Sequence, residues 1–175
     1  MAVDIKQMSR GIIEEAFNKG NVQYLDQICD PSLKVHDPLQ GDFDLAGFKR
    51  MVESYRATFP DLQCTTVGIC AEGDTVCTYW RFTATHQKPF MGAAPTGKKL
   101  TVEGMSFNRY RNGKLAEITS QWDTLGLLQG LGLVPKLELR PPEGAAERRP
   151  HASPEGARSS ARSSASLLAT PWCSR

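Results

Sequence analysis

Residues 113–135 read GKLAEITSQWDTLGLLQGLGLVP. The turn pair Asn112-Gly113 opens a strand in this stretch. The side chains of the strand that a sheet would bury are Leu115, Ile118 and Trp122. Asp123 then stands where a helix N-cap belongs, and Gly132 helps to end a short apolar helix over residues 124–131. The stretch therefore predicts a strand that turns directly into a helix.

Apolar residues recur at steps of three and four in two segments that precede this strand. The first is residues 5–17, which Gly20 closes. The second is residues 45–59, for which Asp44 is the expected N-cap. Both segments predict amphipathic helices that bury one face, and a shorter helix is predicted over residues 22–29.

Further strands are predicted over residues 33–37, 62–71, 75–86 and 100–110. The turn pair Gly73-Asp74 is of the kind that joins antiparallel neighbours. Residues 87–99 are rich in Pro and Gly, and their composition predicts a mobile flap. Helices followed by a run of strands indicate an α+β fold, in which helices pack on one face of a curved antiparallel sheet. Such a sheet encloses a pocket between its concave face and the helices, and small ligands bind in pockets of this kind.

Charge divides the 175-residue chain into two parts. Up to residue 135, 14 Lys and Arg oppose 15 Asp and Glu, whereas from residue 136 onward 7 oppose 4. We predict one domain over residues 1–135 and a disordered, basic, low-complexity tail over residues 136–175, which has no hydrophobic period. No basic stripe with interleaved aromatic residues is present, so nucleic acid is not an expected partner.

The cysteines and the first residues of the chain bear on compartment and metal binding. The five cysteines are Cys29, Cys64, Cys70, Cys77 and Cys173. They form no C-x-x-C spacing and no Cys/His cluster, so no metal site is predicted. Their odd number and the charged first residues favour a reducing, cytoplasmic location, and no segment approaches the length of a membrane span.

Several short motifs follow one another along residues 8–135. They are Ala16-Phe17-Asn18, His36-Asp37-Pro38, Phe59-Pro60-Asp61-Leu62, Glu72-Gly73-Asp74, Thr85-His86, Pro95-Thr96-Gly97-Lys98, Asn112-Gly113-Lys114 and residues 123–132. Their order and spacing resemble those of the SnoaL-like polyketide cyclases, a family of the NTF2-like superfamily. The resemblance implies an NTF2-like cone that forms a homodimer or a larger homo-oligomer, without metal or organic cofactor.

The resemblance also implies a reaction. Family cyclases close a ring by intramolecular aldol condensation, with an Asp as general acid/base, on a hydrophobic polyketide-like substrate. Aligned on the Asn112-Gly113-Lys114 turn, the position of that Asp falls on Ser120, and the position of an assisting His falls on Ser106. Serine is not a base at neutral pH without an activating partner. We therefore take Asp123 and His86 as the candidate catalytic residues.

Each of these candidates also has a structural interpretation. Asp123 either caps the following helix or acts as an acid/base at the pocket mouth. His86 shares strand parity with Trp80, so that it either lines the pocket or carries a proton. His36 either supports local structure or projects into the pocket as a proton carrier. The predicted substrate-binding residues are His36, Ser106, Ser120, Trp122, Trp80, Phe90 and Met91.

Two functions follow from these residues. The first is a cofactor-free, acid/base cyclisation or isomerisation of a hydrophobic polyketide- or terpenoid-like substrate. The alternative is a non-catalytic NTF2-like module that binds a small molecule or dimerises, because the usual catalytic Asp is replaced by Ser120. Phe90 and Met91 either cover the ligand or pack a long loop onto the core.

Overall fold

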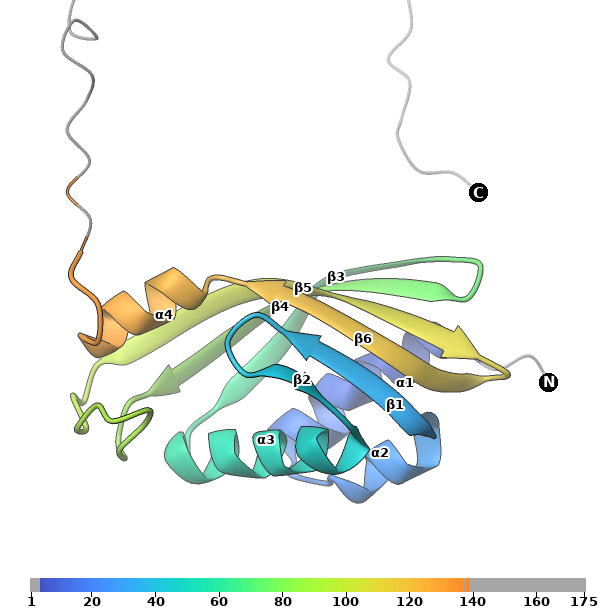
Figure 1. Cartoon of the computed structure of the whole chain (residues 1–175), viewed down its shortest axis with the longest axis horizontal. Helices are drawn as coiled ribbons and strands as arrows, with labels where there is room; N and C mark the ends of the chain where they lie inside the picture. The colour runs from blue at the N-terminus through green and yellow to red at the C-terminus, as the bar shows by residue number, and fades with distance from the viewer. Residues whose placement is uncertain (1–3, 137, 139–175) are drawn as a thin grey trace, which may run out of the picture. The chain divides into compact units, whose positions relative to one another are not determined.

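The computed structural model describes residues 4–136 and residue 138, and residues 4–136 belong to one compact unit (Figure 1). Its helices are α1 (Ile5–Gly11), η1 (Ile12–Asn18), α2 (Gln23–Ile28), α3 (Leu45–Thr58) and α4 (Thr124–Leu131). Its strands are β1 (Cys29–Asp37), β2 (Gly41–Phe43), β3 (Gln63–Glu72), β4 (Thr75–Thr85), β5 (Lys99–Arg111) and β6 (Lys114–Trp122). Apart from Lys136 and Glu138, the predicted disordered tail over residues 136–175 lies outside the described residues.

The helices begin and end largely where the sequence predicts. Asp44 accepts a hydrogen bond from the backbone N–H of Gly47 at 2.8 Å and so caps α3 as expected. The predicted first helix is two segments, because α1 continues into η1, which has the wider turns of a π-helix. η1 ends at Asn18, whose side-chain amide pairs with the backbone of Cys64 on the edge strand β3. None of the described helices combines the length and the apolar character needed to cross a membrane.

The strands form a single sheet in the order β2-β1-β6-β5-β4-β3. β3, β4, β5 and β6 are antiparallel neighbours, which confirms the predicted hairpins. β1, however, runs parallel to β6, so the sheet is mixed and not purely antiparallel. These two strands are far apart in the sequence, and no tight turn between them dictates an antiparallel pairing. The α+β class itself is confirmed.

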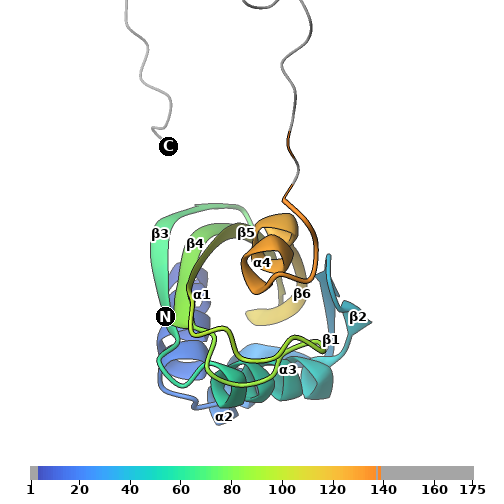
Figure 2. The same cartoon turned by 90° about the vertical axis from the view of Figure 1, so that its left-hand side faces the viewer.

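The curvature of the sheet creates an inside and an outside. Seen along the strands, β3 to β6 arch over one side of the domain, and α1, α2 and α3 lie across the open side of the arch (Figure 2). α4 lies at one end of the sheet, where its Gly130 packs near Leu100 of β5. The inner face of every strand is therefore turned toward helices, and the opposite face is turned away from them.

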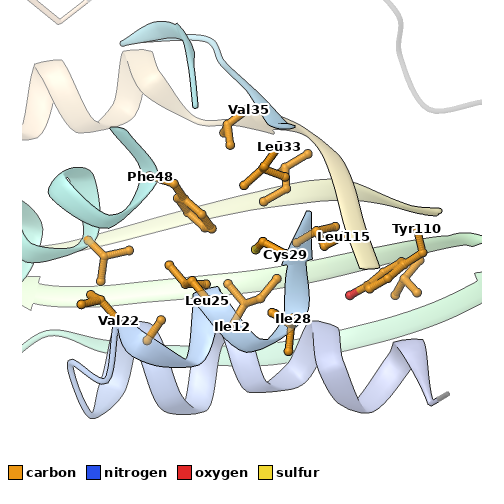
Figure 3. Packing of buried hydrophobic residues seen from close by; sticks show 14 residues of the cluster. Ile12, Val22, Leu25, Ile28, Cys29, Leu33, Val35, Phe48, Tyr110 and Leu115 are labelled. Atoms are coloured by element: carbon orange, nitrogen blue, oxygen red, sulfur yellow. The ribbon is translucent and has the colours of Figure 1, made fainter. Parts of the chain in front are cut away.

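Two hydrophobic clusters fill the inside. The first joins η1, α2 and α3 to β1 and β6, and Figure 3 shows its Leu25, Leu33 and Phe48 directed into the space between helices and sheet. The second lies where α4 meets the sheet and includes Phe59 and Leu131. Each buried Leu or Phe side chain contributes about 1.5–3 kcal/mol relative to exposure, so these clusters account for most of the driving force for folding.

The outer face of the sheet is partly apolar. Met105 and Phe107 of β5 are 49% and 50% exposed there. Beside them Glu103 bonds to Tyr79 and forms an ion pair with Arg81 of β4, with the Arg81 Nε to Glu103 Oε1 distance at 2.6 Å. The homodimer implied by the resemblance would use this face, and the oligomeric state stays a prediction.

Candidate functional site

A cavity lies between the two hydrophobic clusters. Its wall takes Ile12 and Phe48 from the first cluster and Phe59 and Phe82 from the second. It leaves about 120 Å³ of space for the centres of water-sized molecules, several times the ~10–15 Å³ that one buried water needs. The interior is therefore hollow and mostly apolar, as a site for a small organic molecule requires.

Four of the predicted substrate-binding residues line this cavity together: Trp80, Ser106, Ser120 and Trp122. Trp80 of β4 and Trp122 of β6 both lie opposite Gly104 of β5, one on each side. The Trp80 Nε1–H donates to Ser106 Oγ at 3.0 Å, and the Ser106 and Ser120 hydroxyls are hydrogen-bonded to each other at 3.0 Å. These two hydroxyls bond to each other, and no carboxylate or imidazole of the described residues bonds to either of them.

Among the described residues one acidic side chain lines the cavity, and it was not among the predicted site residues. Asp37, at the end of β1, is half-buried and lies in the cavity wall. Its Oδ2 accepts from the Trp122 Nε1–H at 3.0 Å, and its Oδ1 accepts from the backbone N–H groups of Leu39 and Gln40, both at 2.9 Å. The carboxylate is therefore held in a fixed orientation by donors from two elements.

A signal for Asp37 was present in the sequence. Alternate residues of a strand face the same side of a sheet, and Leu33 and Val35 are buried in the second half of β1. Asp37 continues this alternation, and it therefore shares their face, whereas its neighbour His36 has the opposite parity. Because a histidine titrates near neutral pH, the sequence favoured His36 as the functional member of the pair, although the alternation favoured Asp37.

Tyr55 of α3 brings a second polar group to the same wall. Burial, with a smaller contribution from the nearby Asp37 charge, raises the pKa of Tyr55 to about 12. Its hydroxyl oxygen accepts a hydrogen bond from Gln40 Nε2 at 3.3 Å. The phenol therefore keeps its proton at physiological pH and can donate a hydrogen bond to a bound molecule.

The structure places Asp123 outside the cavity. Its side chain is exposed, and its Oδ1 accepts from the backbone N–H of Gly126 at 2.7 Å at the start of α4. This is the capping geometry that the sequence predicted as one of two interpretations. The carboxylate is used in this capping bond at the exposed start of α4, and Asp123 is not among the residues that line the cavity.

Replacing Asp123 by alanine is expected to lower the free energy of unfolding by about 1 kcal/mol, because the Gly126 N–H loses its acceptor. Asp123→Asn is the matched control, since asparagine caps helices as well as aspartate does. Urea unfolding of the full chain measures both variants. Equal losses of stability for Asp123→Ala and Asp123→Asn would show that the side chain does not act as the cap.

His86 is fully buried but is not part of the cavity wall. Its Nδ1 accepts from the backbone N–H of Thr96 at 3.3 Å and lies 3.1 Å from the Thr96 Oγ1. Its backbone bonds to Lys98 and Gly97 at 2.9 Å. His86 therefore closes the base of the loop over residues 86–98. Strand parity alone could not distinguish this structural position from a position in the pocket wall.

His36 lies on the outer face of the sheet. Its Nδ1 is 2.8 Å from Asp42 Oδ1, and its Nε2 is 3.6 Å from Glu117 Oε1. Glu117 in turn is 3.9 Å from the guanidinium of Arg109. The imidazole therefore joins a surface group of charges and cannot reach a molecule inside the cavity from there.

Phe90 and Met91 belong to the same loop over residues 86–98, and neither lines the cavity. The Phe90 ring packs on Tyr55 and Phe59, with ring centroids 5.6 Å and 5.3 Å apart. Met91 is exposed and adopts a positive φ of 50°. Phe90 thus covers the aromatic wall from behind, whereas Met91 points to solvent.

The described residues do not assemble a metal site. Between residues 4 and 136, no group of three or more His, Cys, Asp or Glu side chains is positioned to hold a metal ion. The groups that the cavity wall offers are a carboxylate, a neutral phenol, an amide, hydroxyls, a thiol and indole N–H groups. Such groups can move a proton and hold an oxygen of a bound molecule.

Solved structures with the same fold come from bacterial proteins. AclR from Streptomyces galilaeus, provisionally assigned as a hydroxylase, has a TM-score of 0.68 and 25% identity over 78% of this chain and 91% of its own. IdmH from Streptomyces antibioticus, provisionally assigned as a polyketide cyclase, has a TM-score of 0.65 and 28% identity over 74% and 99%. A protein from Acidithiobacillus ferrooxidans with the same provisional assignment has a TM-score of 0.62 and 30% identity over 76% and 99%.

The comparison with family models agrees with these neighbours. No curated protein sequence matches the chain. The model for the SnoaL-like polyketide cyclases matches residues 7–131, from α1 to the last residue of α4. The matched segment contains all six strands and the whole cavity wall. The chain therefore belongs to the SnoaL-like polyketide cyclase family and has its NTF2-like fold.

Proposed function

We propose that the chain catalyses a cofactor-free, acid/base cyclisation or isomerisation of a hydrophobic polyketide- or terpenoid-like molecule bound in the cavity. The observation that carries the proposal is the position of Asp37, which supplies the one carboxylate among the described residues of a mostly apolar cavity wall. Membership of the cyclase family supports the same reaction class. The proposal replaces Asp123 and His86 by Asp37 as the proton carrier, because neither of the former faces the cavity.

The expected chemistry begins at a carbon next to a carbonyl group. The Asp37 carboxylate removes a proton from this carbon, and the electron pair of the broken C–H bond moves into an enolate. The Tyr55 hydroxyl, protonated because its pKa is about 12, donates to the enolate oxygen. The enolate carbon then forms a bond to a second carbonyl carbon of the same molecule, and the proton held by Asp37 passes to the new alkoxide.

The alternative function is non-catalytic binding. It is supported by Ser106 and Ser120, which bond to each other, with Trp80 bonded to Ser106, and to which no base in the described part of the chain is hydrogen-bonded. These positions then shape an apolar binding site without supplying a proton carrier. The two functions differ in whether the bound molecule loses a proton.

Deuterium exchange distinguishes the two functions. The full chain is mixed with 1-tetralone in D₂O near neutral pH, and loss of the C2 proton signal is followed by NMR, with thermal stabilisation of the protein as the separate measure of binding. We expect exchange well above the buffer rate for the wild type and for the Asp123→Asn variant. Binding with exchange at the buffer rate would contradict catalysis and support the non-catalytic module.

A further inference from the structure

Three buried polar side chains lie together in the part of the cavity wall formed by α1, β4 and β5. Ser9, Thr78 and Asn108 are 1%, 2% and 3% exposed, and all three line the cavity. The reaction proposed above uses none of them. Buried polar groups in an apolar cavity need a stated reason, because each costs free energy unless it is hydrogen-bonded.

Part of this group is satisfied inside the protein. The Asn108 Nδ2–H donates to Ser9 Oγ at 3.1 Å, and the hydroxyls of Ser9 and Tyr110 are hydrogen-bonded at 2.8 Å. These bonds fix the orientation of the Asn108 amide, since its nitrogen end is committed to Ser9. Its oxygen end therefore faces away from Ser9.

Two atoms of the group have no partner in the described part of the chain: Asn108 Oδ1 and Thr78 Oγ1. The two residues are diagonal neighbours on adjacent strands, because Thr78 lies opposite Ser106 and Val76 lies opposite Asn108. One is an acceptor only, and the other can donate and accept. An unpaired acceptor next to an unpaired hydroxyl matches a ligand group that can donate one hydrogen bond and accept another.

We propose that Thr78 and Asn108 form a subsite for a hydroxyl group of the bound molecule, which rests on the proposed function of the cavity. The ligand hydroxyl donates its proton to Asn108 Oδ1 and accepts from the Thr78 hydroxyl. A ketone oxygen cannot donate and leaves Asn108 Oδ1 unpaired. A ligand carboxylate is also disfavoured. It has no proton to donate to Asn108 Oδ1, and the described residues of the cavity wall include no cationic side chain to pair with it.

The position of this subsite adds a constraint on the ligand. His36 of β1 lies beside Thr119 of β6, so the next residue, Asp37, lies beside Ser120. Ser120 is opposite Ser106, which is opposite Thr78. Thr78 is therefore three strand spacings from Asp37, roughly 14 Å along the sheet. The inferred ligand is an elongated apolar molecule with an alcohol or phenol group far from its reacting carbon.

Binding of two matched probes to the full chain tests this subsite. 2-Naphthol carries the hydroxyl, and 2-methylnaphthalene replaces it by a methyl group of similar size. We expect the wild type to bind 2-naphthol about tenfold or more tightly in calorimetry, because only the hydroxyl satisfies both buried atoms. Equal affinities would overturn the subsite and leave the proposed function standing.

Variants assign the preference to these two residues. Thr78→Val and Asn108→Leu are each expected to reduce the preference for 2-naphthol to about twofold or less while 2-methylnaphthalene binds as before. Thr66→Val is the matched control, since Thr66 Oγ1 is also buried and unpartnered but lies outside this cavity wall. Thr78→Val preserves shape, so it decides the question if Asn108→Leu does not fold. A preference that survives Thr78→Val and Asn108→Leu overturns the subsite, and failure of both probes to bind the wild type overturns the cavity as a small-molecule site.

Discussion

The Asp37→Asn variant is expected to exchange the C2 proton of 1-tetralone at least 10²-fold more slowly than the wild type, within the ~10²–10⁴-fold range typical of a positioned acid/base. An amide has nearly the same size as the carboxylate but cannot accept the proton. Its Oδ1 can still accept from the backbone N–H groups of Leu39 and Gln40, so the turn after β1 keeps these hydrogen bonds. NMR in D₂O measures the rate with the assay used for the wild type.

A structural role of Asp37 must be separated from a chemical one. In the Asp37→Asn variant the amide N–H₂ faces the Trp122 Nε1–H, so the hydrogen bond of 3.0 Å is lost. Trp122→Phe is the matched control, because it removes the same hydrogen bond and leaves the carboxylate in place. We expect Trp122→Phe to lose about 1 kcal/mol of stability and less than tenfold in exchange rate. Equal rate losses in the two variants would mean that Asp37 only positions Trp122.

The helix after β6 shows which parts of the fold could be predicted from the sequence. The predicted helix over residues 124–131 has the bounds of α4. Its start is set by the Asp123 cap, and its end by Gly132, which adopts the left-handed conformation with φ 78°. Both signals act within a few residues of the chain. Local chemistry of this kind is readable from a single sequence.

The site was harder to predict because it depends on register between strands. The pairing of Ser106 with both Thr78 and Ser120 is fixed by two hairpins, and β5 and β6 change register between Arg109 and Tyr110. Such a bulge inserts one residue and reverses which side chains face inward beyond it. No local pattern in residues 100–122 reports where the extra residue lies. Trp80, Ser106, Ser120 and Trp122 were placed correctly in the wall, but their hydrogen-bond partners were not foreseeable.

The candidate catalytic residues show a second limit. His86 was predicted to line the pocket, but it lies outside the cavity wall and its partner is Thr96, on the far side of a loop. Asp123 had two interpretations, and the structure shows the capping bond to Gly126. Asp37 gained its position from the parallel pairing of β1 with β6, two strands that are far apart in the sequence. Chemical type pointed to His86 and Asp123, whereas tertiary pairing places Asp37 in the cavity wall.

Gly104→Ala is expected to destabilise the domain by about 1–3 kcal/mol, the usual cost of overpacking a well-packed interior. Gly104 lies between the two tryptophans on the inner face of the sheet. A Cβ at this position would overlap the Cβ of Trp122 and would lie 2.6 Å and 2.8 Å from two ring carbons of Trp80. Neither indole can move freely, because Trp80 is bonded to Ser106 and Trp122 to Asp37. Urea unfolding measures the loss of stability.

The same substitution is expected to weaken binding of 2-methylnaphthalene, since a displaced indole must enter the cavity that both tryptophans line. Gly68→Ala is the matched control on β3: the nearest atom to its added Cβ would be the Tyr79 Cβ at 3.9 Å, an ordinary contact. We expect Gly68→Ala to keep wild-type stability within about 0.5 kcal/mol and to bind the probe unchanged. The contrary result is a Gly104→Ala variant that is as stable as Gly68→Ala and binds the probe as tightly. The positions of the two indoles would then not require a glycine at position 104, and the geometry of the cavity wall described above would be wrong.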